Sequence, residues 1–150
     1  GHSAGGQFVH RWALLGGKKN ADVIAVANSG WFTMPDRDID YPYGIKNVGI
    51  TDEELGEAFA KPVILFMGEK DVERKPPFRD TPEADAQGMN RMERCTNYFR
   101  QCKAKAEELR VPFRWKLETV EGVAHQGVKM AEGAMSYILG KSSEDRNRRV

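Results

Sequence analysis

The first residues of the sequence, Gly1-His2-Ser3-Ala4-Gly5, place a serine between two glycines at the spacing G-x-S-x-G. This spacing is typical of a sharp strand-to-helix turn that projects a serine hydroxyl into a cleft as a nucleophile. The two glycines are expected to avoid Cβ clashes between the incoming strand and the outgoing helix. We therefore interpret Ser3 as a candidate nucleophile, and the backbone N–H of Ala4 as an oxyanion donor at the helix start.

The pentapeptide alone also fits a glycine-rich loop with a passive serine, so the rest of the chain must supply the partners of a nucleophile. Asp71 follows the apolar run 62–68, and His125 follows the alternating run 113–120. If both runs are strands of one parallel sheet, Ser3, Asp71 and His125 all emerge at its carboxyl edge, where open α/β sheets hold their sites. The three residues together predict a serine, histidine and aspartate triad.

Other residues compete for these roles. Glu69 and Asp80 lie on the same predicted loop as Asp71, which we favour because Gly68 gives a turn that lets its carboxylate fold back towards the histidine. His125 could itself be a structural loop histidine, although its place after a strand favours catalysis. Two further histidines are expected to be structural, His2 packed against the sheet and His10 on the polar face of a helix. The three histidines have no metal-ligand spacing, so we expect no metal site.

Hydrophobic patterns predict the elements that must position these residues. The runs 22–28 and 62–68 indicate buried parallel strands, and the run 113–120 indicates a half-exposed edge strand. Apolar residues at helical spacing predict a helix over 7–15, with Phe8, Trp12 and Leu15 on its buried stripe. Further helices are expected from the capping box at Thr51 to about residue 60, from residue 89 to 110, and over 126–139, ended by Gly140. Alternating strands and helices favour an α/β fold with right-handed crossovers and a covered parallel sheet.

The segments between these elements are predicted to have separate roles. Residues 28–61, rich in Pro, Gly, Asp and aromatic side chains, form a lid-like insertion in which Trp31 is a candidate substrate contact. Residues 69–84 are expected to be a loop. The helix at 89–110 is predicted to bury Met89, Met92 and Phe99. Cys95 and Cys102 lie about 10.5 Å apart along its axis, too far for a disulfide, so we expect two buried free thiols.

Composition excludes several classes of function. A chain of 150 residues with 23 basic and 22 acidic side chains has a net charge of +1 and room for about one domain. It has no strong field to attract nucleic acid. No run of about 20 apolar residues is present, so we expect no membrane span.

The motif, the strand pattern and the order serine, aspartate, histidine resemble the carboxyl-terminal half of an α/β-hydrolase of the serine-esterase type. The segment GHSAGGQFVHRWALL also resembles polyhydroxyalkanoate-depolymerase-like esterases. The resemblance implies an α/β-hydrolase half-domain over 1–140, with the lid at 28–61 and a polar tail at 141–150. It further implies that Ser3 attacks an acyl carbon, His125 transfers the proton and Asp71 orients the histidine.

The resemblance implies cleavage of small-molecule or polymeric carboxylic esters through an acyl-enzyme, with no cofactor. The early strands and the second oxyanion donor of the family are absent from the sequence. Activity is therefore expected only together with an N-terminal segment or a partner chain. Two alternatives stay open: a peptidase or thioesterase acting through the same triad, and a non-catalytic half-domain.

Overall fold

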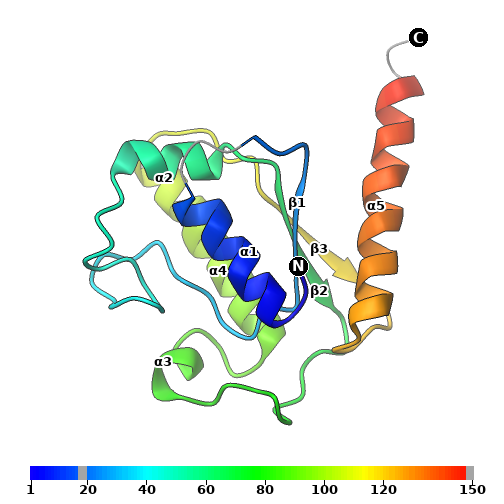
Figure 1. The fold of residues 1–150 in the computed structure, drawn as a ribbon, viewed down its shortest axis with the longest axis horizontal. Helices are drawn as coiled ribbons and strands as arrows, with labels where there is room; N and C mark the ends of the chain where they lie inside the picture. Colours follow the sequence, from blue (N-terminus) through cyan, green and yellow to red (C-terminus); the bar gives the residue numbers. More distant parts are fainter. Residues whose placement is uncertain (17–19, 148–150) are drawn as a thin grey trace.

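A computed structural model describes residues 1–16 and 20–147, with side chains up to residue 140. Its centre is a parallel sheet in the order β1-β2-β3, formed by Ile24–Ala27, Val63–Gly68 and Lys116–Val120. Figure 1 shows α1 (Ala4–Leu15), α2 (Asp52–Phe59) and α4 (Arg91–Glu108) on one side of this sheet, and α5 (Gly127–Asn147) on the other. The predicted α/β fold is therefore confirmed.

The middle strand, β2, explains why the sheet needs helices on both faces. All six of its residues, with the sequence VILFMG, are buried. Val63, Leu65 and Met67 belong to the larger core cluster, which includes residues of α1, α2 and α4. Ile64 and Phe66 point the other way, into a smaller cluster with residues of α5. Successive side chains alternate between the faces of a strand, so a continuous apolar run requires both faces to be covered.

Several element boundaries differ from the predictions. Strand β1 is shorter than predicted at both ends, and β3 is shorter at its amino-terminal end. The last three residues of the predicted loop 69–84 belong instead to the single turn α3 (Pro82–Asp85). Thr81 caps this turn by accepting a hydrogen bond from Ala84 N–H, and a proline suits the first helical position.

Helix α5 continues past Gly140 to residue 147, so the predicted stop is wrong. Gly140 lacks the positive φ with which glycine commonly ends a helix. Residues 148–150 of the predicted tail lie outside the described part.

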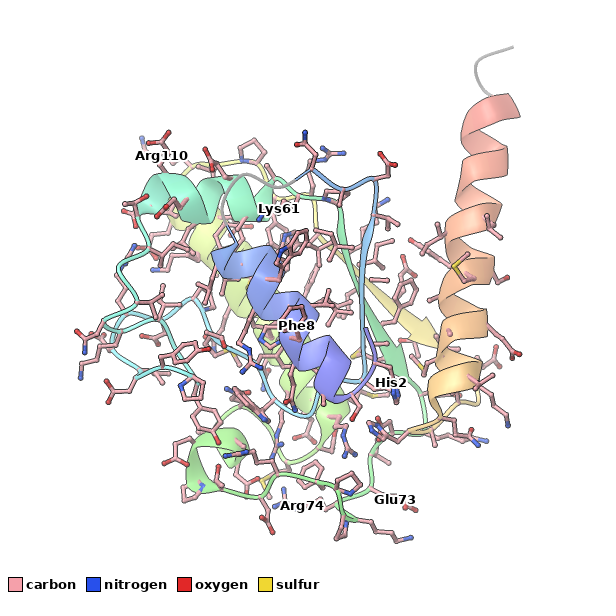
Figure 2. The ribbon with its side chains drawn as sticks, in the orientation of Figure 1. His2, Phe8, Lys61, Glu73, Arg74 and Arg110 are labelled. Carbon is pink, nitrogen blue, oxygen red and sulfur yellow. The ribbon has the colours of Figure 1, made fainter. Side chains whose placement is uncertain are left out.

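The buried face of α1 matches its predicted hydrophobic stripe only in part, because Trp12 and Leu15 pack against the larger core and Phe8 does not. Phe8 is 67% exposed, and the buried residues of the helix are Gly6, His10, Ala13 and Leu14. Figure 2 labels Phe8 on α1. The helix lies so close to the sheet that its contact face uses glycine and a hydrogen-bonded histidine, which carry no hydrophobic signal.

Helix α4 and the segment 28–61 both contribute to the larger core. Cys95 and Cys102 are buried free thiols, as predicted, and burial raises the pKa of both. Met89 lies just before the helix and is 53% exposed, so its predicted burial is wrong. The segment predicted as a lid places seven apolar side chains in this core, namely Phe32, Met34, Ile45, Ile50, Leu55, Ala58 and Phe59.

Candidate active site

Ser3 lies at the junction between β1 and α1, in a backbone conformation rare for a residue with a side chain. Its φ is 55° and its ψ is −118°. The residues before it pair with β1 in parallel fashion: Ala27 N–H donates to Gly1 O over 2.8 Å, and Ser3 N–H donates to Ala27 O over 3.0 Å. Helix α1 then begins at once with Ala4. Such strain persists only where surrounding structure holds it, and it is often found at functional sites.

Of the two glycines that flank Ser3 in the motif, Gly1 has its predicted role and Gly5 does not. A Cβ atom on Gly1 would lie 2.4 Å from Gly5 O, so Gly1 is required by close approach. A Cβ atom on Gly6 would lie 2.8 Å from Ala27 O, whereas one on Gly5 would have no neighbour within 4 Å. The close approach of α1 to the sheet therefore depends on Gly6, and the prediction for Gly5 is wrong.

Ala4 is the first residue of α1, so its backbone N–H has no hydrogen-bond partner within the helix. The first N–H groups of a helix have no partner one turn earlier, and the helix dipole places partial positive charge there. The position of Ala4 directly after Ser3 suits an oxyanion donor, and that role stays a prediction.

Asp71 is held just beyond the carboxyl end of β2. Its backbone N–H donates to Gly68 O over 3.0 Å, which folds the chain back at this point. A Cβ atom on Gly68 would lie 2.6 Å from Val123 O and 2.9 Å from Ala124 O. Gly68 is therefore required because the loop that carries His125 passes directly over it.

The structure brings Ser3, His125 and Asp71 together in one chain of hydrogen bonds. His125 Nε2 lies 2.9 Å from Ser3 Oγ, and His125 Nδ1 lies 2.7 Å from Asp71 Oδ2. Asp71 is 4% exposed and His125 is 24% exposed. A proton on Nδ1 satisfies the carboxylate and leaves Nε2 free to accept a proton from the hydroxyl.

Asp71 is the carboxylate that bonds His125 among the described residues. Glu69, one of its competitors in the sequence, instead accepts a hydrogen bond of 2.7 Å from Gly122 N–H. Asp80, the other competitor, is exposed and forms no hydrogen bond with His125 in the described part of the chain.

Arg91 is part of this site although nothing in the sequence singled it out. Its guanidinium donates to Asp71 Oδ1 over 3.1 Å and to Pro77 O over 2.8 Å. The side chains of Arg91 and Asp71 are both 4% exposed. Arginines on amphipathic helices are usually solvated, so no periodicity could have indicated this buried ion pair.

His2, the residue before Ser3, pairs with the sheet and also contacts His125. It bridges to Ala27 of β1, and its ring centroid is 4.7 Å from that of His125. Figure 2 labels it near the start of α1. Burial lowers the pKa of His2, and the neighbouring His125 lowers it further.

His10 is buried, so its predicted place on a polar helix face is wrong. It is 0% exposed, and it accepts a hydrogen bond of 2.9 Å from Thr33 N–H at Nε2. Its Nδ1 therefore carries the proton and donates to Gly6 O over 3.1 Å. Burial lowers the pKa of His10 to about 3, so the ring is neutral.

A cavity of about 510 Å³ lies beside the histidine and the aspartate, lined in part by Lys70, Pro76 and Arg91. Trp31 is not among the described residues that line it. The Trp31 ring is 6% exposed and packs against Tyr43, Arg11 and Arg79. A contact between Trp31 and substrate stays a prediction.

Within residues 1–16 and 20–147, no group of three or more His, Cys, Asp or Glu side chains is placed to hold a metal ion. In the same part of the chain, no helix combines the length and the apolar character needed to cross a membrane.

Comparisons with known proteins give matches among solved structures. No protein-family model and no curated protein matches the chain. It is similar to poly(aspartic acid) hydrolase-1 from Sphingomonas sp. KT-1, with 37% identity and a TM-score of 0.86 over 89% of this chain and 51% of that one. It is also similar to a poly(3-hydroxybutyrate) depolymerase from Bordetella parapertussis, with 34% identity and a TM-score of 0.84 over 91% and 46%. The chain thus spans about half the length of these relatives.

Proposed function

Because this chain belongs to the α/β-hydrolase superfamily, we propose that it forms the catalytic part of a serine hydrolase that cleaves carboxylic esters through an acyl-enzyme. One observation carries the proposal, the hydrogen-bond chain from Ser3 Oγ through His125 to Asp71, with lengths of 2.9 and 2.7 Å. Fold alone does not define a reaction, so the argument rests on this geometry.

In the proposed reaction, Ser3 Oγ attacks the acyl carbon while its proton passes to His125 Nε2. The protonated imidazole then gives this proton to the departing alcohol, and an acyl-serine ester remains. Water attacks that ester in the second half of the reaction while His125 takes its proton. The bond between the acyl carbon and Ser3 Oγ then breaks, His125 returns the proton to Ser3 Oγ, and the carboxylic acid leaves. Asp71 holds the imidazole in the tautomer that both steps need, and its negative charge stabilises the imidazolium.

The Ala4 N–H is the proposed donor to the oxyanion that forms at the acyl oxygen. We propose that the second donor comes from residues outside this chain, in an N-terminal segment or a partner chain. The chain spans 51% and 46% of the two relatives named above, which supports a contribution from further residues. Hydrolysis is expected to require them.

A polymeric ester is the favoured substrate because one matched relative is a poly(3-hydroxybutyrate) depolymerase. Amide hydrolysis is a second candidate, and its support is the 37% identity to a poly(aspartic acid) hydrolase. The same triad chemistry serves both bonds, and pocket shape decides between them. Thioester cleavage uses the same acyl-enzyme and remains a third variant of this proposal.

The proposal is tested by treating the protein, including any residues that precede Gly1, with a fluorophosphonate. We expect one covalent adduct, mapped to Ser3 by peptide mass spectrometry, because only an activated serine reacts at a useful rate. Ser3→Ala serves as the control and is expected to lose the adduct and the hydrolysis of a p-nitrophenyl ester.

If Ser3→Ala hydrolysed the ester at the parental rate and the parent formed no adduct, the result would instead support the alternative in which this site is non-catalytic. Comparing a p-nitrophenyl ester with the matching anilide separates the first two substrate classes. A higher kcat/KM for the anilide than for the ester would make amides, and not esters, the proposed substrate class.

A further inference from the structure

Asn28 occupies a buried position directly after β1. It is 5% exposed, and its φ of 45° lies in the left-handed region that asparagine tolerates better than most residues. Its backbone N–H donates to Phe66 O over 3.1 Å, which fixes the residue against β2. The backbone that carries this side chain is therefore fixed in place at the carboxyl edge of the sheet.

The side-chain amide of Asn28 joins the two loops that carry the histidine and the aspartate. Its Oδ1 accepts a hydrogen bond of 2.8 Å from Gly68 N–H, three residues before Asp71. Its Nδ2 donates over 3.2 Å to Ala124 O, one residue before His125. One planar amide thus links the end of β2, which leads to Asp71, to the loop that carries His125.

The residue before Asn28 anchors the third member of the triad. Ala27 O accepts the 3.0 Å hydrogen bond from Ser3 N–H. Adjacent positions at the end of β1 therefore hold the loops of all three triad residues. Other bonds join only the aspartate and histidine loops, such as that from Lys70 N–H to Val123 O, with a length of 2.9 Å.

We propose that Asn28 is a positioning residue for the triad, an inference that rests on the proposed function. It acts by holding His125 at the distance from Asp71 and Ser3 that proton transfer needs. The role requires an amide, because one end must accept from Gly68 and the other must donate to Ala124. A carboxylate at this position keeps the acceptor but turns a second oxygen towards the carbonyl of Ala124, which repels it.

The test compares Asn28→Asp and Asn28→Gly with the parent in the full protein. Glycine keeps the positive φ available, and aspartate keeps the side-chain size. Asn97→Asp is the matched control, because Asn97 also donates to a backbone carbonyl, Gln87 O over 2.9 Å, but joins neither triad loop. Fluorophosphonate labelling followed to completion measures both the fraction of reactive sites and the labelling rate constant.

We expect both Asn28 variants to label completely but slowly, with kcat per labelled site reduced about 10- to 100-fold, the loss that a small misplacement of catalytic groups causes. Their KM is expected to stay within about twofold, because no substrate contact is removed. Asn97→Asp is expected to label and turn over within about twofold of the parent by the same reasoning.

Two results overturn the inference while the parent protein labels on Ser3. One is that Asn28→Asp keeps the parental kcat per labelled site and differs only in a smaller fraction of sites that react with the fluorophosphonate, which indicates a structural role. The other is an equal loss in Asn97→Asp. A parent that fails to label contradicts the proposed function itself, so the two failures are distinguishable.

Discussion

Arg91 and Asp71 form a buried ion pair, with Arg91 3.1 Å from Asp71 Oδ1 and both side chains 4% exposed. The other carboxylate oxygen of Asp71 is bonded to His125. Removing one partner of a buried pair leaves an uncompensated charge. We expect Arg91→Met to lower the free energy of unfolding by about 3–5 kcal/mol, measured by urea denaturation, and to lower kcat because Asp71 loses its support.

Arg91→Lys is the matched variant, since it keeps the positive charge but not the fork that also reaches Pro77 O. Its stability and kcat are expected to fall between those of the parent and Arg91→Met. Equal urea midpoints for parent and Arg91→Met would show that the pair contributes no net stability.

Asp71 is the predicted acid of the triad, and replacing it tests that role directly. Asp71→Asn removes the charge that stabilises a protonated His125 and disturbs its tautomer. We expect kcat to fall by about four orders of magnitude, measured with a p-nitrophenyl ester. Asp80→Asn, at a competitor that does not bond His125, should retain parental activity; the opposite ranking of the two variants would reassign the acid.

The two glycines after Ala4 should respond differently to alanine. At Gly6 a Cβ atom would lie 2.8 Å from Ala27 O, and at Gly5 it would meet nothing within 4 Å. We expect Gly6→Ala to lose about 1–3 kcal/mol of stability, because α1 must move away from β1. Gly5→Ala is expected to be neutral or up to about 1 kcal/mol more stable, because alanine favours helix.

Thermal unfolding of the two variants, read by circular dichroism, measures this difference. A lower Tm for Gly5→Ala than for Gly6→Ala would contradict the arrangement of α1 on the sheet.

His10 makes stability depend on pH. Its folded pKa of about 3 lies below the ordinary value of 6.5, so below pH 6.5 the unfolded chain binds a proton that the folded chain does not. The contribution of the neutral, buried His10 to the free energy of unfolding is complete above pH 6.5 and is lost as the pH falls towards 3. The slope is about 1.4 kcal/mol per pH unit in that window.

His10→Gln provides the comparison for this slope. The variant is expected to be less stable than the parent at pH 7, because it cannot reproduce both the bond from Thr33 N–H and the bond to Gly6 O. Its free energy of unfolding should fall less steeply between pH 6 and 4, measured by urea denaturation at each pH. Parallel slopes for the two proteins would show that His10 is not buried as a neutral ring.

Local patterns in the sequence were enough to predict the three strands and the main helices. The run 62–68 is apolar throughout because both faces of β2 are covered, and Thr51 begins α2 with a capping box that forms as predicted. Placement of Ser3, Asp71 and His125 at one sheet edge follows from parallel strands, since their carboxyl ends share an edge. The predictions for Phe8 and His10 failed because the close approach of α1 to the sheet, and not hydrophobicity, decides which side chains of this helix are buried.

The sequence by itself determined the order of the elements, the serine turn and the three residues that the carboxyl edge of the sheet would collect. Tertiary structure decided which carboxylate reaches His125, that Arg91 supports it and that Asn28 joins its loop to the sheet. The reason is physical: strands and helices leave a periodic signal along the chain, whereas a buried ion pair or a bridging amide depends on which distant backbone segments cross. Such crossings exist only after the chain has folded.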